Sequence, residues 1–395
     1  MCPLRVAVAV VAGSAPVADE GDCDHAEAWD KMRSQCPVAY SDSLGWALLR
    51  HADVMEALLN PDAYSNVVSA HLNVPNGMDP PRHTSYRATI EPYFSSARMQ
   101  KLEPTCREIA ERLVNDLPSN DGEVEFISAF AQKFALDMQC AFTGWPRQLR
   151  EPLRLWTQNH QQATLAGDRV ALTKLASEFH DDVAKTLAAR RSHPEDDITT
   201  ELVCEKVDGR SLTDEEIVSI LRNWTVGELA TITAALGIVA YHLCKNPTLQ
   251  SRLREVPEET AAAIEEILRM DAPLLSNRRK TTRDVKIGGR QLKQGDRVTL
   301  MWASANRDES AFPEADSFRP RRDQQRNLLY GAGIHGCPGA PLARLELRVA
   351  VECLLAGTTD LKTSIHHTPV RAEFPAAGFA CLPLRVSRSQ GLTCH

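Results

Sequence analysis

Apolar residues recur at three- and four-residue spacing over much of the chain, a pattern typical of amphipathic helices. The pattern is clearest in residues 51–60, 97–117, 170–190 and 259–270. Alternating apolar and polar residues, which indicate strands, are confined to residues 284–302, where two runs flank Gly288 and Gly289, and to residues 381–387. Together these patterns predict a mainly helical fold with small β-sheets.

The longest predicted helix begins after Thr213, which has capping-box spacing with Glu216, and continues to about residue 243. About thirty residues at 1.5 Å each span roughly 45 Å, enough to cross a whole domain. The middle of this helix carries polar or small residues where a buried helix is expected to be apolar. They are Asn223, Thr225, Gly227, Glu228, Thr231 and Thr233. Either irregular packing or a ligand that passes this point explains them.

The 395 residues contain no tract of the composition that marks a linker. We therefore expect an irregular N-terminal extension at residues 1–20 and a single domain at residues 21–395. No apolar run approaches the ~20 residues of a membrane span, and a net charge of −7 argues against a nucleic-acid surface. The eleven cysteines include no C-x-x-C pair, which predicts reduced thiols rather than a zinc or iron–sulfur site. These features indicate a cytoplasmic protein that binds neither membrane nor nucleic acid.

The stretch YGAGIHGCPG places one cysteine, Cys337, among several glycines. Glycine lowers stability in regular structure by roughly 0.5–1 kcal/mol relative to alanine, so its repeated use indicates a backbone of unusual shape. A helix predicted at residues 341–355 follows, and its positive N-terminal end together with the amides of Gly339 and Ala340 would stabilise a thiolate. Pro338 has no N–H and is expected in the first turn of this helix, where the loss costs little. A lone cysteine in a loop is usually inert, so the loop has to be interpreted together with other motifs.

Several motifs, in this order along the chain, resemble those of the cytochrome P450 family. Residues 79–87, DPPRHTSYR, are similar to the helix-C signature. Glu266 and Arg269 are similar to the helix-K pair, and Arg322 to the arginine of the meander that follows it. The cysteine loop is similar to the haem-binding loop, with tyrosine where phenylalanine is usual. Its matching residues are Tyr330, Gly331, Gly333, His335, Cys337 and Gly339.

The resemblance implies the P450 fold, with a long central helix over haem b and with Cys337 as the axial ligand of the iron. It further implies that Glu266, Arg269 and Arg322 form a structural ionic network that does no chemistry itself. The residues implied to bind the haem or its propionates are His83, Arg87, Arg279, His335, Gly331 and Gly339.

The chain departs from the family on the long helix. The resemblance places Thr231 at the threonine that manages protons during oxygen activation, but Ala230 stands where the acid is usual and Glu228 where glycine is usual. Residues i and i+3 share a helix face, so Glu228 can stand near Thr231 and substitute for the missing carboxylate. The alternative is that Glu228 points into solvent or into a structural ion pair. Thr231 and Glu228 are therefore the candidate catalytic residues.

The expected substrate pocket has a largely apolar wall with two amides, which suits a small hydrophobic or aromatic molecule. The residues expected to line it are Asn223, Val226, Gly227, Leu275 and Asn277, with the loops near His71 and Phe379. The segments NWTVGELATI and LLYGAGIHGCPGAPLARLEL resemble most closely the haem domain of bacterial self-sufficient enzymes, which carry a fused FMN and [2Fe–2S] reductase. Electrons are thus expected from NAD(P)H, through such modules or through a separate ferredoxin partner.

The function that the resemblance implies is that of a monomeric monooxygenase. It would take two electrons from its partner, activate O2 and hydroxylate or O-dealkylate its substrate. A peroxide-driven haem enzyme is one alternative, favoured by Ala230, and a non-catalytic haem-binding or gas-sensing domain with Cys337 as ligand is a second. A helical scaffold without haem is a third.

Overall fold

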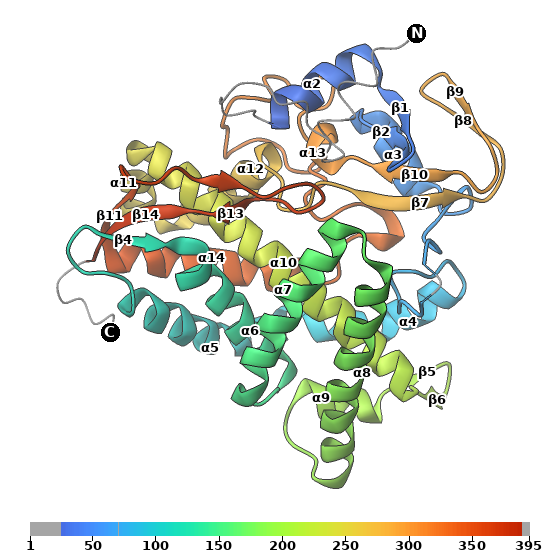
Figure 1. The fold of residues 1–395 in the computed structure, drawn as a ribbon, viewed down its shortest axis with the longest axis horizontal. Helices are drawn as coiled ribbons and strands as arrows, with labels where there is room; N and C mark the ends of the chain where they lie inside the picture. Colours follow the sequence, from blue (N-terminus) through green and yellow to red (C-terminus); the bar gives the residue numbers. More distant parts are fainter. Residues whose placement is uncertain (1–24, 70, 389–395) are drawn as a thin grey trace.

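A computed structural model of the protein describes residues 25–69 and 71–388. The extension predicted for residues 1–20 lies outside the described residues. Helices dominate the fold and enclose a large apolar core (Figure 1). They are α2 (His25–Gln35), α3 (His51–Leu59), α4 (Arg82–Ile90), α5 (Ser96–Asn115), α6 (Gln132–Thr143), α7 (Arg150–Ala166), α8 (Arg169–Ser192), α9 (Ile198–Cys204), α10 (Asp214–Lys245), α11 (Pro247–Glu255), α12 (Thr260–Met270), α13 (Trp302–Ala305) and α14 (Ala340–Gly357).

The long central helix is α10, and its start is fixed by the predicted capping box. The Thr213 hydroxyl accepts a hydrogen bond from the Glu216 amide at 3.3 Å, and the Glu216 carboxylate accepts one from the Thr213 amide at 2.9 Å. Two orphan amides at the helix start are thereby satisfied. The helix is long and apolar enough to be a membrane span by composition. However, it packs against α6, α8, α12 and α14 inside the protein, so its apolar residues form part of the core.

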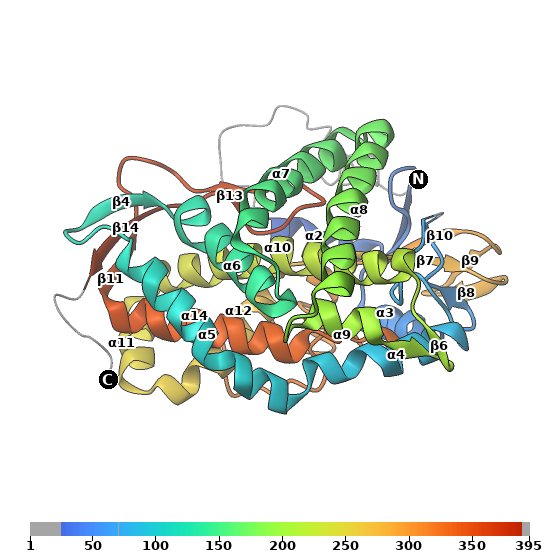
Figure 2. The ribbon, with the colours of Figure 1, turned by 90° about the horizontal axis from the view of Figure 1, so that it is seen from below.

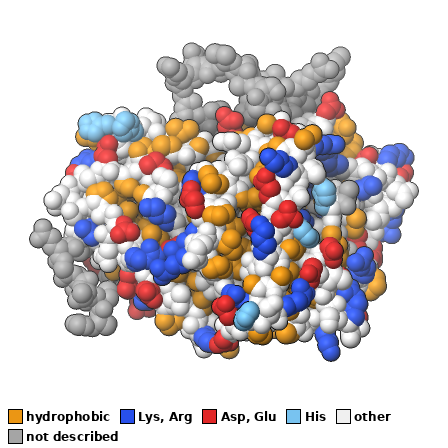
Figure 3. All heavy atoms as spheres, turned by 60° about the horizontal axis from the view of Figure 1, so that its bottom comes forward, with side chains coloured by type: hydrophobic (Ala, Val, Ile, Leu, Met, Phe, Trp, Pro, Cys, Tyr) orange, Lys and Arg blue, Asp and Glu red, His pale blue; other side chains and the backbone are white. Residues whose placement is uncertain are grey.

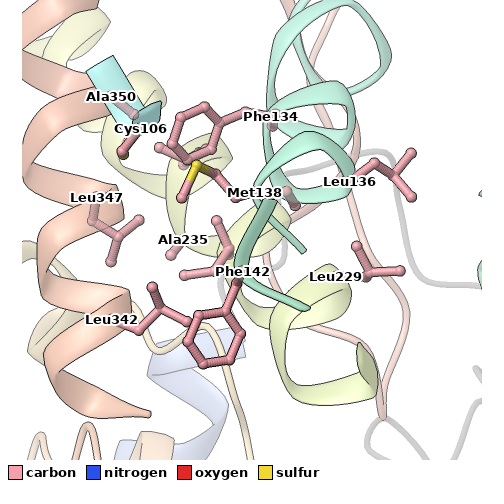
Figure 4. Packing of buried hydrophobic residues seen from close by; sticks show 14 of the residues in the cluster. Cys106, Phe134, Leu136, Met138, Phe142, Leu229, Ala235, Leu342, Leu347 and Ala350 are labelled. Atoms are coloured by element: carbon pink, nitrogen blue, oxygen red, sulfur yellow. The ribbon is translucent and has the colours of Figure 1, made fainter. Parts of the chain in front are cut away.

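Helix α14 runs along α5 over most of its length and also contacts α10 and α12 (Figure 2). Between α14, α6 and α10, apolar side chains interlock: Leu347 and Leu342 from α14, Phe142 from α6 and Ala235 from α10 (Figure 4). Burying side chains of this size contributes roughly 1.5–3 kcal/mol each, which makes this contact a rigid base for the residues near it.

The strands form small sheets at the edges of the helical core. The largest sheet has the order β1-β2-β10-β7-β3, and a second has the order β11-β14-β4. The bounds of the first are β1 (Val38–Ser41), β2 (Gly45–Leu48), β10 (Arg297–Leu300), β7 (Asn277–Thr281) and β3 (Tyr64–Ser65), and those of the second are β11 (Thr358–Thr363), β14 (Pro383–Arg388) and β4 (Gly122–Glu125). Three strand pairs remain: β8 (Val285–Ile287) with β9 (Arg290–Leu292), β5 (Lys206–Val207) with β6 (Arg210–Ser211), and β12 (Val370–Arg371) with β13 (Phe379–Cys381).

The two alternating runs predicted in residues 284–302 form three strands instead. The first run and the start of the second are the hairpin β8–β9, as the Gly288 and Gly289 turn suggests. The second run is then interrupted by a turn at Gly295, whose φ of +87° suits glycine. After that turn the chain joins the five-stranded sheet as β10, antiparallel to β7. The other predicted elements correspond to α3, α5, α8, α12, α10, α14 and β14, so the mainly helical prediction is confirmed.

Candidate functional site

The cysteine loop has the unusual backbone that its glycines indicate. Gly331 and Gly333 have φ values of +71° and +69°, in the left-handed region that favours glycine. A Cβ atom on Gly333 would lie 2.6 Å from the carbonyl oxygen of Leu58 on α3, so no side chain fits there. The Cys337 amide donates to the Tyr330 carbonyl at 2.8 Å and closes the loop. These constraints hold one exposed thiol in a defined place.

The Cys337 sulfur lies at the N-terminal end of α14. The backbone N–H groups of Gly339 and Ala340 donate to it, as predicted from the sequence, and the positive charges of Arg87 and Arg344 act on it as well. Desolvation of the sulfur by the protein around it raises the pKa of the Cys337 thiol above its ordinary value, although these contacts lower it in part. A bound metal ion deprotonates a thiol outright, and the donors at hand then stabilise the thiolate.

Pro338 does not lie in the first turn of α14. Gly339 is the N-cap, the helix begins at Ala340, and Pro341 takes the early helical position expected for Pro338. The amides that reach the sulfur belong to the N-cap and to the first helical residue, so the preceding residue, Pro338, has to lie outside the helix.

Four basic side chains from three elements meet beside this loop: His83 and Arg87 on α4, Arg279 on β7 and His335 in the 3-10 turn η5 (Gly333–His335). The His83 and His335 rings lie 4.2 Å apart between centroids. Burial and the charges of His83, Arg279 and Arg87 lower the pKa of His335 to about 3. Burial likewise lowers the pKa of Arg279 to about 10, against the opposing effect of Asp79.

The two imidazoles present unused polar atoms to this cluster. Nε2 of His83 and Nε2 of His335 are buried without a hydrogen-bond partner among the described residues. Burying a polar atom without a partner is costly, and concentrated positive charge favours an anion. A carboxylate-bearing group next to the thiol satisfies both requirements. The residues present therefore fit a haem with its propionates here.

Glu266, Arg269 and Arg322 form one buried network behind the loop. Arg269 donates to both carboxylate oxygens of Glu266, at 2.8 and 2.9 Å, and both side chains are fully buried. Arg322 Nε donates to Glu266 at 3.1 Å. The remaining guanidinium donors bind the backbone carbonyl oxygens of Asn306, Ala315, Pro313 and Glu314. Removal of one partner from such a buried network leaves an uncompensated charge in the core, so the network is stable only when all of its members are present.

Two asparagines that the sequence analysis missed connect this network to the cysteine loop. Arg269 binds the Asn306 carbonyl oxygen at 2.7 Å, and the Asn306 side chain accepts a hydrogen bond from the Leu328 amide at 2.8 Å. Asn327 in turn binds Asn306 and the Leu329 amide. Single asparagines in loops carry no recognisable motif, so the sequence offered no signal for them.

The exposed side of α10 carries the predicted threonine. Gly227 and Ala230 are exposed and Thr231 is partly exposed, whereas the residues on the other sides of the helix are packed in the core. The Thr231 hydroxyl donates to the Gly227 carbonyl at 2.5 Å. The backbone of the same helix thus orients the hydroxyl in the absence of an acid at residue 230.

Glu228 does not share this exposed side, which corrects the expectation that it stands beside Thr231. It is 9% exposed, and its carboxyl group interacts with that of Glu346 on α14. Residues i and i+3 differ by about 60° around a helix, and this difference is enough to direct Glu228 toward α14. The alternative of solvent or an ion pair is also incorrect, because the partner is another acid.

The residues predicted to line the substrate pocket have different contacts in the structure. Asn223 uses its amide to hold the Val74 carbonyl at 2.8 Å, and the Asn277 side chain accepts from the neighbouring Arg278 amide. Leu275 packs against an apolar cluster of the β-sheet region. Val226 and Gly227 are exposed on α10 beside Thr231.

The two loops named as further pocket candidates differ in the same way. His71 is exposed, whereas Phe379 is buried between Tyr241 and the guanidinium group of Arg371. Tertiary packing, which the linear pattern does not reveal, separates these two candidates.

Comparisons with known proteins bear on the family of the chain. The family model described as Cytochrome P450 matches residues 146–359. The chain is 31% identical to vitamin D(3) 25-hydroxylase of Pseudonocardia autotrophica over 86% of the chain and 87% of the relative. It is 30% identical to linalool 8-monooxygenase of Pseudomonas putida over 82% and 86%.

Solved structures show the same likeness. CYP109E1 of Bacillus megaterium, solved in complex with testosterone, superposes with a TM-score of 0.83 at 25% identity, over 92% of this chain and 99% of that one. The family model spans the thiolate loop, the long helix, and Arg279 and His335 of the basic cluster. The chain therefore belongs to the cytochrome P450 family.

Proposed function

We propose that this protein is a haem-thiolate monooxygenase that inserts one oxygen atom of O2 into a small apolar molecule. The observation that carries the proposal is the exposed Cys337 thiol with its two amide donors, next to a buried basic cluster with unused imidazole nitrogens. Such an arrangement suits a metal ligand beside an anionic edge.

Each residue of the site has a role in this proposal. Cys337 would bind the haem iron, and Gly339 and Ala340 would hold its charge through their amides. His83, Arg87, Arg279 and His335 would bind the propionates, with Gly331 and Gly339 against the porphyrin. When bound, haem supplies the iron at which O2 is reduced and split. Thr231, oriented by Gly227, would hold a hydrogen bond and pass a proton on the exposed side of α10.

Substrate class follows from the exposed side of α10 and from the relatives. Val226, Gly227 and Ala230 offer apolar surface beside the Thr231 hydroxyl. Two relatives are named for vitamin D(3) and linalool, and a similar structure was solved with testosterone, all of which are largely apolar molecules. Hydroxylation of a molecule of this class is the activity we propose, with O-dealkylation where the substrate carries an ether.

A groove of about 520 Å³ near the thiolate loop is the place proposed for an electron-donating partner. Its walls come from α5, α12 and α14 and include Tyr330, Met99 and Arg344. Arg344 is paired with Glu265 at 2.9 Å, and Glu103 and Arg348 also line the groove, so its walls carry both signs of charge. Acidic and basic side chains are interspersed on the face of the molecule that Figure 3 shows as well. A partner with mixed charge therefore suits this protein better than a strongly acidic one.

The electrons are proposed to come from NAD(P)H through a separate ferredoxin and its reductase, in the cytoplasm, to a monomeric enzyme. The two curated relatives are covered over 86–87% of their own length, which leaves no room for a fused reductase in them. They give no support to the particular resemblance to self-sufficient enzymes.

A peroxide-driven enzyme is the second candidate, because Ala230 provides no acid beside Thr231. A comparison of turnover with NAD(P)H and carriers against turnover with peroxide alone separates the two. Turnover only with peroxide would overturn the monooxygenase proposal in favour of this one, and activity with neither would favour a haem-binding sensor.

The ligation itself is tested by reducing the purified protein under carbon monoxide and recording the Soret band. Thiolate ligation gives a strongly red-shifted band, which Cys337→Ala should abolish. Cys204→Ala, which removes another exposed thiol, is the matched control and should keep the band. A wild-type protein without the shifted band would exclude the haem-thiolate assignment.

A further inference from the structure

Two acidic side chains contact each other in the core between α10 and α14. Glu346 is fully buried and Glu228 is 9% exposed. Their carboxyl groups interact with one another. Oε1 of Glu228 and both oxygens of Glu346 are buried, and none of them accepts a hydrogen bond from a donor in the described part of the chain. The flanking residues Leu229 and Leu347 belong to the apolar packing of Figure 4.

In the part of the chain that the structure describes, no basic side chain is paired with Glu228 or Glu346. Both acids act on the buried thiol of Cys106 on α5, whose pKa is raised mainly by burial, and Cys353 and Arg107 act on the same thiol. The neighbouring arginines bind other carboxylates. Arg107 binds Glu352, and Arg344, two residues before Glu346, binds Glu265. The contact is therefore made by two acids alone.

Two ionised carboxylates cannot make such a contact favourable. Each is an acceptor without a proton to donate, and like charges repel strongly where water is absent. One proton changes this, because the protonated acid donates to the other oxygen in a charge-assisted hydrogen bond. We propose that Glu228 and Glu346 share one proton and that this hydrogen bond ties α10 to α14.

The direction of both titrations agrees with a shared proton. Burial raises the pKa of Glu228 to about 7, and burial together with the neighbouring Glu228 raises the pKa of Glu346 well above its ordinary range. The two groups titrate as a pair, so the proton belongs to the contact rather than to either residue.

The hydrogen bond between Glu228 and Glu346 links α10 and α14, each of which carries part of the proposed haem site. Thr231 is less than one turn beyond Glu228 on α10, and α14 starts beside the Cys337 sulfur. Glu228 and Glu346 contact neither Thr231 nor the Cys337 sulfur. They are positioning residues, which fix the position of α10 relative to α14, the helix that supports the thiolate. This positioning role rests on the proposed function, whereas the shared proton does not.

Infrared spectroscopy of the purified protein at neutral pH tests the shared proton. A protonated carboxyl group has a carbonyl band distinct from that of a carboxylate, so wild type minus Glu228→Gln/Glu346→Gln should show this band. Each single glutamine variant should shift the band, because an amide replaces one partner of the hydrogen bond. Glu108→Gln, on exposed α5 surface, is the control and should leave the band unchanged.

Unfolding by urea gives a second measurement that does not depend on turnover. Raised pKa values mean that the folded protein holds the proton more tightly, so the pair stabilises it at low pH and loses this effect as pH rises. The urea midpoint of wild type should fall more between about pH 5 and pH 8 than that of the double variant. Equal pH dependence, or a carboxyl region identical in wild type and both single variants, would overturn the shared proton. If the reduced wild-type protein shows no red-shifted Soret band under carbon monoxide, this result would instead count against the proposed function alone.

Discussion

The imidazole ring of His83 lies 4.2 Å from that of His335, although the two residues come from α4 and from the cysteine loop near the other end of the chain. Both rings keep Nε2 buried without a partner, and Arg279 and Arg87 add positive charge around them. Burial and these nearby positive charges favour the neutral form of both imidazoles in the haem-free protein.

Acid should therefore destabilise the haem-free protein through His335. Its pKa is depressed from 6.5 to about 3, so its contribution is present above about pH 6.5 and is lost as pH falls toward 3. His335→Gln should remove part of this loss, on the order of 1–2 kcal/mol after allowing for solvent screening. Urea unfolding at about pH 5 and pH 7 measures it. The same acid sensitivity in both proteins would show that His335 has no part in it.

Breaking the buried pair behind the loop should cost far more than breaking one on the surface. Arg269→Met leaves Glu266 buried and charged, with an expected loss of about 3–5 kcal/mol in the free energy of unfolding. Arg321→Gln removes an exposed partner of Glu259 and should cost less than about 1 kcal/mol. Denaturant titration compares the two variants, and similar losses would contradict the structural role of the network.

Alanine substitutions at two glycines of the loop should lower the stability of the protein by different amounts. Gly331 and Gly333 share a positive φ, which costs a non-glycine residue about 1–2 kcal/mol. A Cβ on Gly333 also meets the Leu58 carbonyl at 2.6 Å, whereas one on Gly331 has no atom closer than 3.9 Å. Gly333→Ala should therefore lose roughly 1–3 kcal/mol more than Gly331→Ala. Thermal unfolding tests the order, and equal melting temperatures would refute it.

Thr231→Ala should divert electrons from product to peroxide. The variant loses the hydroxyl that Gly227 orients, and a positioned proton-transfer group contributes about a hundredfold or more to rate. Product and peroxide formed per NAD(P)H give the result directly. Thr233→Ala removes a hydroxyl from the same helix and is the matched control. Unchanged coupling in Thr231→Ala would remove this residue from the mechanism.

Local patterns predicted much of the fold. The period of apolar residues indicated α3, α5, α8 and α12, and the capping box marked the start of α10, because these features depend on neighbours within one turn. Glycine spacing around Cys337 predicted the loop for the same reason, since a positive φ is a property of single residues.

Other features depended on contacts between distant segments. The second run of residues 284–302 divided between two sheets because β10 finds its partners at β7 and β2. The place of Pro338 outside α14 followed from the three-dimensional path of the loop.

The amino-acid sequence by itself thus determined α3, α5, α8, α10, α12 and α14, the cysteine loop and the membership of the basic cluster, because their signals are local or lie in recognisable motifs. Only the tertiary structure decided where Glu228 points. Helical periodicity places a residue on a side of its helix, but the neighbour on that side is Glu346, more than a hundred residues away in the chain. Packing of α14 against α10 creates this contact, and no pattern within either helix contains it.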